Sequence, residues 1–452
     1  MKIKTILASE IAALDSDVLT GGGTDDTEAL QKALDEALAC GGVKLIMDGA
    51  ALVRGLKVHS NTTIECMSPD CGFYLADNSN CAIVTNANWQ PYSLDTRNIA
   101  LIGGTYNQNC LHQEHDVPRT PETRLHNVPE DMNNHWIYCI EFYGVENLTL
   151  RDLTIRNQRT FAFMLCCFRR CTIENVWIDL IDYMPANNQD GFHFWGPGEF
   201  LTIRNVGGRV GDDFMNLGPD EHDGKSSITD VIVDGVYLDD ADQAIRLLSR
   251  GTGKLDRVTI RNVSGCYHGL GFYINPWSPT PSYGDFGNIR FENIDLRPLD
   301  VHYINDPFLF AVGGNIERLT FQNIHHHRAK HKYNLFQIGR TTYSAEFNEE
   351  HMLEPHIGTL IVDSLTVDDD DQNAADTEYM YLKARVDTLI LRDITVLRTP
   401  EIEPCGTFLR TYPGSRLTNL LVDRTYTQKL AHFTDFAENT VQNTTFTDIH
   451  ET

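Results

Sequence analysis

A short phrase of sequence recurs about every thirty residues along much of this chain, and it restricts the possible folds more than any other feature. Each copy has alternating apolar residues, a polar pair rich in Asn or Asp, and then another apolar residue; the copies are Leu148–Ile155, Thr172–Val176, Leu201–Val206, Val258–Val263, Ile289–Ile294, Leu319–Ile324 and Leu389–Ile394. The spacings are 30, 27, 31 and 30 residues between the markers Ile203, Val233, Ile260, Phe291 and Phe321. This period, with strand patterns and no helical pattern between copies, predicts a solenoid in which each turn adds parallel strands. We therefore predict an all-β fold, a single-stranded right-handed parallel β-helix.

The first sixty residues are expected to cap this solenoid. An amphipathic helix is predicted after an N-cap at Thr24 or Asp25, and Gly41 follows where the helix would end. The expected apolar face comprises Ala29, Leu30, Ala33, Leu34, Ala37 and Leu38. Such a helix would cover the edge of the first strands, which would otherwise pair with other chains. With a cap and first strands in residues 1–60 and repeat turns over residues 98–450, residues 1–452 are predicted to form a single β-helix domain.

The composition argues against some partners and compartments. Hydrophobic residues make up 41% of the chain and charged residues 22%, which is typical of a globular protein. The net charge of −26 argues against nucleic acid or an anionic membrane as a partner, because either requires a basic surface. The segment Met1–Glu10 reaches an acidic residue before any apolar run long enough for a signal peptide, so we expect a cytoplasmic protein unless the sequence was trimmed. The eleven cysteines, odd in number and mostly in apolar contexts, favour buried thiols over a disulfide framework.

Two segments about twenty residues apart, Asn188–Phe194 and Gly211–Leu217, alternate apolar residues as half-buried strands do. The polar residues expected on the opposite face are Asp190, His193, Asp213 and Asn216. If the strands are neighbours about 4.8 Å apart, Asp190, Asp212 and Asp213 crowd one small patch. Asp212 joins this patch only if the chain bends at Gly211. Crowded carboxylates repel and raise the proton affinity of at least one, which suits an acid and a base in one site.

The equivalent strands of neighbouring turns are expected to form one sheet with ionisable groups on its outward face. These strands are Phe161–Leu165, Asp190–Phe194, Asp213–Leu217, Gln243–Leu247 and His268–Tyr273. A solenoid core does not need ionisable groups, so they are candidates for function. Long insertions interrupt the period at residues 107–134, 180–189, 276–287 and 329–357, and are expected to wall a groove over these strands. Candidate linings of that groove are Trp195, Tyr273, Trp277, Tyr283, His112 and His115, whose aromatic members could stack on sugar rings.

With the repeat, the cap and the carboxylates in place, the chain resembles the polygalacturonases, family 28 of the glycoside hydrolases within the pectin-lyase-like β-helix group. That family carries N-T-D-G, then D-D about twenty residues later, then G-H-G and R-I-K. Here Asn188–His193 resembles the first motif, Gly211–Asp213 the second and Tyr267–Leu270 the third. An extra turn containing Ala241–Arg246 separates the second and third motifs, and R-I-K is missing.

The resemblance implies inverting hydrolysis of an α-linked oligo- or polysaccharide, with galacturonic acid among the candidate sugars. Asp212 would act as the general acid, while Asp190 and Asp213 would hold and deprotonate a water molecule. His268 would tune the acid or bind substrate. The residues expected to contact substrate are Asn188, Gln189, His193, Trp195, Asn216, Arg246 and Tyr273. The mechanism needs no metal and no organic cofactor, and the oligomeric state is left open.

Arg246 is the candidate to replace R-I-K, which binds the substrate carboxylate in the family. An ion pair with Asp213 or Asp242 is the alternative for this side chain. Arg246 and Tyr273 would also be the catalytic candidates if the chain were a polysaccharide lyase or a uronate epimerase on the same scaffold. A further alternative is a non-catalytic glycan-binding β-helix, although such a protein would gain little from three mutually repelling acids. Clustered carboxylates could also bind Ca²⁺.

Two conspicuous runs are interpreted as ordinary surface. His325–His327, together with His331, could bind a metal, but the run is expected to leave a strand for a loop. Asp368–Asp371 is interpreted as a solvated turn.

Overall fold

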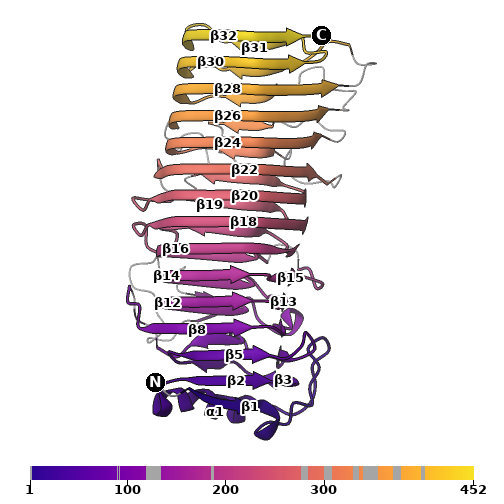
Figure 1. Ribbon diagram of the computed structural model, residues 1–452, viewed down its shortest axis with the longest axis vertical. Helices are drawn as coiled ribbons and strands as arrows, with labels where there is room; N and C mark the ends of the chain where they lie inside the picture. The colour runs from indigo at the N-terminus through magenta and orange to yellow at the C-terminus, as the bar shows by residue number, and fades with distance from the viewer. Residues whose placement is uncertain are drawn as a thin grey trace. The chain divides into compact units, whose positions relative to one another are not determined.

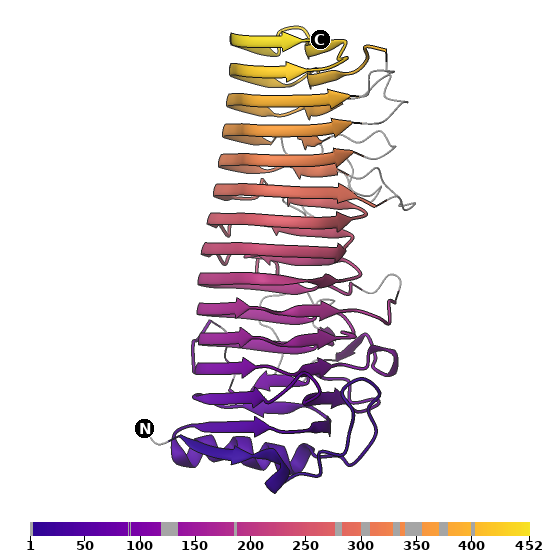
Figure 2. The same cartoon turned by 45° about the vertical axis from the view of Figure 1, so that its right-hand side comes forward.

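The structure is a computed structural model of the whole chain. It describes residues 3–88, 90, 92–118, 134–184, 188–275, 283–299, 308–328, 335–339, 355–369, 378–398 and 403–452. The chain divides into two compact units, an N-terminal unit of Met1–Met215 and a C-terminal unit of Asn216–Thr452. Each unit is built from stacked coils of parallel strands, as Figures 1 and 2 show, so the predicted parallel β-helix is confirmed. That residues 1–452 are a single domain stays a prediction.

The N-terminal unit has three series of parallel strands. The first pairs in the order β1 (Lys4–Leu7), β2 (Val43–Met47), β5 (Thr62–Cys66), β8 (Thr96–Ile102), β12 (Ile140–Arg151), β14 (Phe163–Glu174) and β16 (Phe192–Arg209). The second runs through β3 (Ala50–Val53), β6 (Gly72–Leu75), β9 (Thr105–Asn107), β13 (Thr154–Arg156) and β15 (Trp177–Asp179) to the end of β16. The third joins β4 (Leu56–Val58) and β7 (Val84–Asn86) to the start of β12. Side chains at one register position stack inside the coils, as do the fully buried Leu150, Ile173 and Ile203.

Helix α1 (Thr27–Cys40) packs against β1, β2 and β4 and covers the first coil, as predicted. It ends at Gly41, whose φ of 87° is left-handed. The N-cap is Asp26 rather than Thr24 or Asp25; its carboxylate makes no cap hydrogen bond and instead accepts hydrogen bonds from the N–H groups of Ala13 and Leu14, which anchor the preceding loop. Leu38, predicted for the apolar face, is 69% exposed. The shorter elements of this unit are the 3₁₀ turns η1 (Ala8–Glu10) and η2 (Cys110–His112) and an antiparallel pair of β10 (Asp116–Pro118) and β11 (Asn134–Trp136).

The C-terminal unit has two series of parallel strands. Long strands pair in the order β18 (Ile228–Asp240), β20 (Leu255–Tyr267), β22 (Phe286–Pro298), β24 (Asn315–Arg328), β26 (His356–Asp369), β28 (Arg385–Arg398), β30 (Arg416–Thr427) and β32 (Val441–Glu451). Short strands pair in the order β19 (Gln243–Leu248), β21 (Leu270–Asn275), β23 (Phe308–Val312), β25 (Phe336–Ile338), β27 (Glu378–Leu382), β29 (Thr407–Thr411) and β31 (His432–Phe436). Strand β17 (Asp213–Gly218) contains the boundary between the units.

The spacing that predicted the solenoid corresponds to one coil. Four of the sequence markers, Val233, Ile260, Phe291 and Phe321, are direct register partners in β18, β20, β22 and β24. Phe291 and Phe321 stack with ring centroids 5.3 Å apart and planes at 14°. The repeat therefore records residues that lie one above another in the core.

The polar pair of each repeated phrase has a backbone function. The second member of the pair has a left-handed φ of 49–59° in all seven copies: Asp152, Asn175, Asn205, Asn262, Asn293, Asn323 and Asp393. Asn and Asp adopt this conformation at less cost than other non-glycine residues, which explains their recurrence. The Asn side chains also form a ladder, in which Asn323 donates to Asn293 (2.8 Å) and Asn293 donates to Asn262 (2.9 Å).

All eleven cysteines are described, and none forms a disulfide. Seven are buried: Cys66, Cys71, Cys110, Cys139, Cys166, Cys167 and Cys171. Burial raises the pKa of the Cys66 and Cys171 thiols to about 12. Across the described ranges, no helix has the length and apolar character needed to cross a membrane.

The structure places both of the runs that were interpreted as ordinary surface differently from the prediction. His325–His327 lies within strand β24, not in a loop. Asp369 is 2% exposed; the Tyr379 hydroxyl donates to its carboxylate, and Arg398 Nε lies 3.6 Å from it, so this part of the acidic run is not a solvated turn. Asp370, Asp371 and His331 lie outside the described residues.

Candidate active site

Backbone hydrogen bonds place two of the three candidate aspartates at one position in neighbouring coils of the N-terminal unit. The N–H of Gly191 donates to the carbonyl of Asp213 (2.8 Å). In a parallel ladder this bond pairs the residue before the donor with the residue whose carbonyl accepts, so Asp190 and Asp213 are register partners. Equivalent bonds extend the column to Phe161 and Tyr138 in earlier coils. Strands in such a ladder lie about 4.8 Å apart, so the two aspartates project from adjacent points of the backbone.

Asp212 lies in a bend immediately before β17. The chain bends at Gly211 and Asp212, and the N–H of Gly211 donates to the carbonyl of Gln189 (2.9 Å). In an unbroken ladder Asp213 would bind that carbonyl, so the bend contributes two extra residues to this strand. A Cβ at position 211 would lie 2.8 Å from the ring of Tyr183, so a larger residue would displace this exposed ring. The bend expected at Gly211 is present.

Burial distinguishes the three carboxylates. Asp190 and Asp213 are each 2% exposed, whereas Asp212 is partly exposed. Asp190 also precedes β16, which begins at Phe192, so it lies in the irregular segment before the strand and not in the strand that the sequence predicted. At Gly191 the backbone of the next coil approaches closely, because a Cβ there would lie 2.3 Å from the carbonyl oxygen of Phe214. One accessible carboxyl thus lies beside two that the fold holds in place.

His193 contacts Asp190 and is itself held by aromatic rings. Its Nδ1 lies 2.9 Å from Oδ2 of Asp190, and both side chains are 3% exposed. The imidazole stacks on Phe161, with centroids 4.0 Å apart and planes at 4°, and its edge contacts Trp195 at 5.8 Å. Trp195 is partly buried against the cluster that contains Tyr138 and Phe161. His193 therefore orients the Asp190 carboxylate, and its burial leaves little surface for direct contact with a ligand.

A repeated Asn-Gln pair fixes the backbone before Asp190. The pair occurs as Asn107-Gln108, Asn157-Gln158 and Asn188-Gln189, so its recurrence is a sequence signal for this backbone position. Gln158 Nε2 donates to the carbonyl of Asp190 (3.2 Å), and Gln189 Nε2 donates to the carbonyl of Gln158 (2.8 Å). Gln189 is 1% exposed, so this predicted substrate contact is a buried structural amide, whereas Asn188 is exposed.

Tyr183, another residue near the aspartates, was not predicted from the sequence. Its side chain is 56% exposed, and its ring packs against Gly211, next to Asp212. An exposed aromatic ring beside a carboxyl group is a common platform for the apolar face of a sugar. Its position in an irregular insertion gave no periodic signal.

The remaining predicted site residues belong to the C-terminal unit. Tyr273 is 3% exposed and packs with Leu270 and Ala311. The guanidinium carbon of Arg246, which is partly exposed, lies 5.4 Å from the centroid of the Tyr273 ring. Tyr273 is therefore a buried support for Arg246 rather than an exposed lining residue.

His268 and Asn216 have different environments in this unit. His268 Nδ1 lies 2.8 Å from Asp240 Oδ1, and its Nε2 lies 3.9 Å from Asp242 Oδ1. Asn216 is 1% exposed, and its Oδ1 has no donor among the described residues. Trp277 and much of the predicted groove walls lie outside the described residues.

Comparison with known proteins shows a shared fold. No protein-family model and no curated protein matches the chain. The A-module of mannuronan C-5 epimerase AlgE4 from Azotobacter vinelandii matches with a TM-score of 0.50 and 12% identity, over 100% of this chain and 99% of that one. Two exopolygalacturonases also match: the family 28 enzyme of Yersinia enterocolitica (TM-score 0.45, 14% identity, 100% and 77% coverage) and that of Thermotoga maritima (0.47, 12%, 98% and 92%). At these identities the likeness extends to the parallel β-helix and no further.

Proposed function

We propose that the chain is a glycoside hydrolase that cleaves an α-linked oligo- or polysaccharide with inversion, using Asp212 as the general acid and Asp190 with Asp213 to hold and activate water. The observation that carries this proposal is the register pairing of Asp190 with Asp213 beside the bend that leaves Asp212 partly exposed.

The three environments suit the two tasks of inverting hydrolysis. One carboxyl group must reach the leaving oxygen from the substrate side, and carboxylates on the other side must bind water. Asp212 is the one with access, while the backbone fixes Asp190 and Asp213, and His193 contacts Asp190 at 2.9 Å. Repulsion among closely spaced carboxylates favours a proton on one of them, as a general acid requires.

Recognition of an acidic sugar would require a cation, for which the sequence offers Arg246 as the candidate. Arg250 Nη2 lies 3.2 Å from Glu221 Oε1, and the pKa of Arg250 is lowered by burial and also by the charge of Arg246. Arg250 is paired with Glu221, so Arg246 stays the candidate for a carboxylate ligand. Oligosaccharides that contain galacturonic acid, a candidate sugar by the resemblance to the polygalacturonases, are the first substrates to try.

The test is the release of reducing ends from pectic and neutral α-linked oligosaccharides by the parent chain and by Asp212→Asn. We expect the substitution to lower kcat by about 10²- to 10⁴-fold, the usual contribution of a general acid. Asp152→Asn is the matched control, because Asn already occupies the equivalent corner in Asn175 and Asn205. The control should keep full activity.

The same assay separates the alternatives. A rise in absorbance at 235 nm would show elimination by a lyase, and conversion of the uronate without new reducing ends would show epimerisation. Activity abolished by EDTA would indicate Ca²⁺ bound by the carboxylates. An Asp212→Asn chain as active as the parent would contradict the assignment of the acid.

A further inference from the structure

Two histidines and two aspartates form a cluster on three successive coils of the C-terminal unit. Asp295 is on β22, His325 and His327 are on β24, and Asp368 is on β26. Asp295 is the register partner of His325, and Asp368 is the register partner of His327. Residues two apart on a strand share a face, so both imidazoles lie between the two carboxylates. His326, between them, points into the core and is 1% exposed.

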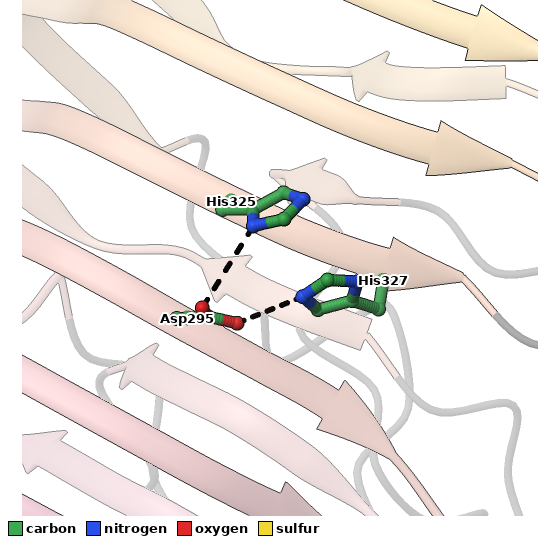
Figure 3. Close-up of side chains that lie close together, drawn as sticks. All are labelled: Asp295, His325 and His327. Carbon is green, nitrogen blue, oxygen red and sulfur yellow. Dashed lines mark hydrogen bonds and ion pairs between the residues drawn. The ribbon is translucent and has the colours of Figure 1, made fainter.

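The imidazoles converge on Asp295, as Figure 3 shows. His327 Nε2 lies 2.9 Å from Asp295 Oδ1, and His325 Nδ1 lies 3.8 Å from Asp295 Oδ2. One donor atom from each of the three residues lies within 4.8 Å of the others. In a tetrahedral zinc site, bonds of about 2.0–2.2 Å put neighbouring donor atoms roughly 3.4 Å apart. The observed separations lie on both sides of that value.

Asp368 occupies the opposite side of both rings. His325 Nε2 lies 2.8 Å from Asp368 Oδ2, and His327 Nδ1 lies 3.6 Å from the same oxygen. If His325 Nδ1 and His327 Nε2 bind a cation, the other nitrogen of each ring carries a proton; that of His325 is within hydrogen-bond distance of Asp368, whereas that of His327 faces the same carboxylate at 3.6 Å. Metal-binding histidines usually donate this second N–H to a carboxylate, which fixes the tautomer and the ring orientation. A surface pair of His and Asp would need only one carboxylate for each ring.

We propose that Asp295, His325 and His327 bind one divalent transition-metal ion of the Zn²⁺ type, and that Asp368 holds the His325 imidazole in the binding tautomer. Two nitrogen donors and one oxygen donor suit Zn²⁺, Co²⁺ or Ni²⁺, whereas Ca²⁺ and Mg²⁺ require oxygen ligands. The side chains are 36–58% exposed, so the ion reaches the site from solvent and water completes its coordination. The ion would link β22 to β24 and thereby cross-link two coils.

The site is independent of the proposed hydrolase. None of the residues proposed for acid–base chemistry lies on β22, β24 or β26. Metal that binds the folded state alone stabilises it by mass action, so saturation should raise the melting temperature without any change in glycosidase activity.

The test is calorimetric titration of the metal-free full chain with Zn²⁺, together with the visible spectrum of bound Co²⁺. We expect one ion per chain, a tetrahedral Co²⁺ spectrum, and binding lost to background in His325→Gln and in His327→Gln. Asp368→Asn should bind about 10- to 100-fold more weakly, as expected for a group that acts through the ligands. Because all four side chains are on the surface, circular dichroism should show each variant folded.

The matched control is His356→Gln. His356 Nε2 lies 2.9 Å from Asp387 Oδ2, so it is also a surface imidazole paired with a carboxylate in the same unit. The His356→Gln variant should bind Zn²⁺ with the same affinity as the parent chain. The proposal is overturned if Zn²⁺ does not bind, if the two histidine variants bind as tightly as the parent, or if Ca²⁺ competes equally. Equal affinity of Asp368→Asn and the parent would overturn the role of Asp368.

Discussion

Local packing sets the chemistry of single residues in this protein, and burial has the largest effect. His222 shows this outside the candidate active site. Its side chain is 8% exposed and its Nε2 lies 3.7 Å from Asp223 Oδ2. Burial lowers the pKa of His222 from its ordinary value of 6.5; the charges of Asp223 and Glu221 act in the opposite direction, and Lys225 adds to the lowering. Burial is the largest of these effects, so the folded chain keeps this imidazole neutral.

The stability of the fold should therefore depend on His222 below about pH 6.5. Between the lowered pKa of the folded state and 6.5, the unfolded chain binds a proton that the folded chain does not, so stability falls as pH falls through this window. We expect the urea midpoint of the parent to drop more than that of His222→Gln between pH 7.5 and pH 5. Above pH 7 the slopes of the two proteins should agree.

His450→Gln is the control for this prediction. His450 pairs with Asp448 at 2.9 Å, but its side chain is 66% exposed. Its removal should leave the parental pH dependence in place. Identical pH profiles for the parent and His222→Gln would show that burial of this imidazole does not influence folding.

Residue types in the candidate active site were predictable, but their environments were not. The alternation around Phe192 and Phe194 correctly placed both phenylalanines in the core, where they are fully buried. It could not show that His193, on the other face, is buried as well, because Phe161, on which the imidazole stacks, comes from another coil. Tyr183 was missed for the same reason, since its contact with Gly211 depends on an irregular insertion.

At the scale of the elements, left-handed corners between strands recur from coil to coil. Asn293 is an example with φ of 55°, and its side chain lies in the middle of the ladder between Asn262 and Asn323. A left-handed conformation costs an ordinary residue about 1–2 kcal/mol. Each ladder hydrogen bond adds about 0.5–1.5 kcal/mol of net stability.

Asn293→Ala should consequently lower the free energy of unfolding by about 2–5 kcal/mol, since it adds backbone strain and removes two hydrogen bonds. Asn293→Gly removes the same hydrogen bonds, but glycine adopts the left-handed conformation without strain, so this variant should lose less free energy of unfolding than Asn293→Ala. Urea-induced unfolding followed by circular dichroism measures both. An alanine variant more stable than the glycine variant would show that the corner imposes no conformational demand.

The elements were predictable because their signal is repeated. Each coil imposes the same core position and the same corner, so Asn or Asp at the corner recurs beside apolar markers even though the intervening residues differ. The strand boundaries were less predictable. In the N-terminal unit, Phe163–Glu174 and Phe192–Arg209 are each one continuous strand where two shorter ones were expected, because a bend in a strand leaves no clear mark in its alternation.

For the molecule as a whole, the dominant electrostatic property is a net charge of −26. If the substrate is an oligosaccharide of galacturonic acid, this charge repels it over distances comparable with the Debye length, which is about 30 Å at 0.01 M salt and about 10 Å at 0.1 M. This net value already includes the positive charges of Arg246 and Arg250. Repulsion should therefore limit the rate of encounter at low ionic strength.

Salt should accordingly accelerate the reaction of an acidic substrate. Between 0.01 and 0.1 M NaCl, we expect kcat/KM for an oligogalacturonate to rise by roughly three- to tenfold, because screening removes a long-range barrier to association. A neutral oligosaccharide of equal length should show a constant kcat/KM, which controls for any effect of salt on the fold. Initial rates at substrate concentrations well below KM give both values. A fall in kcat/KM for the acidic substrate would mean that the local field of the arginines governs encounter, and that the net charge has no influence on catalysis.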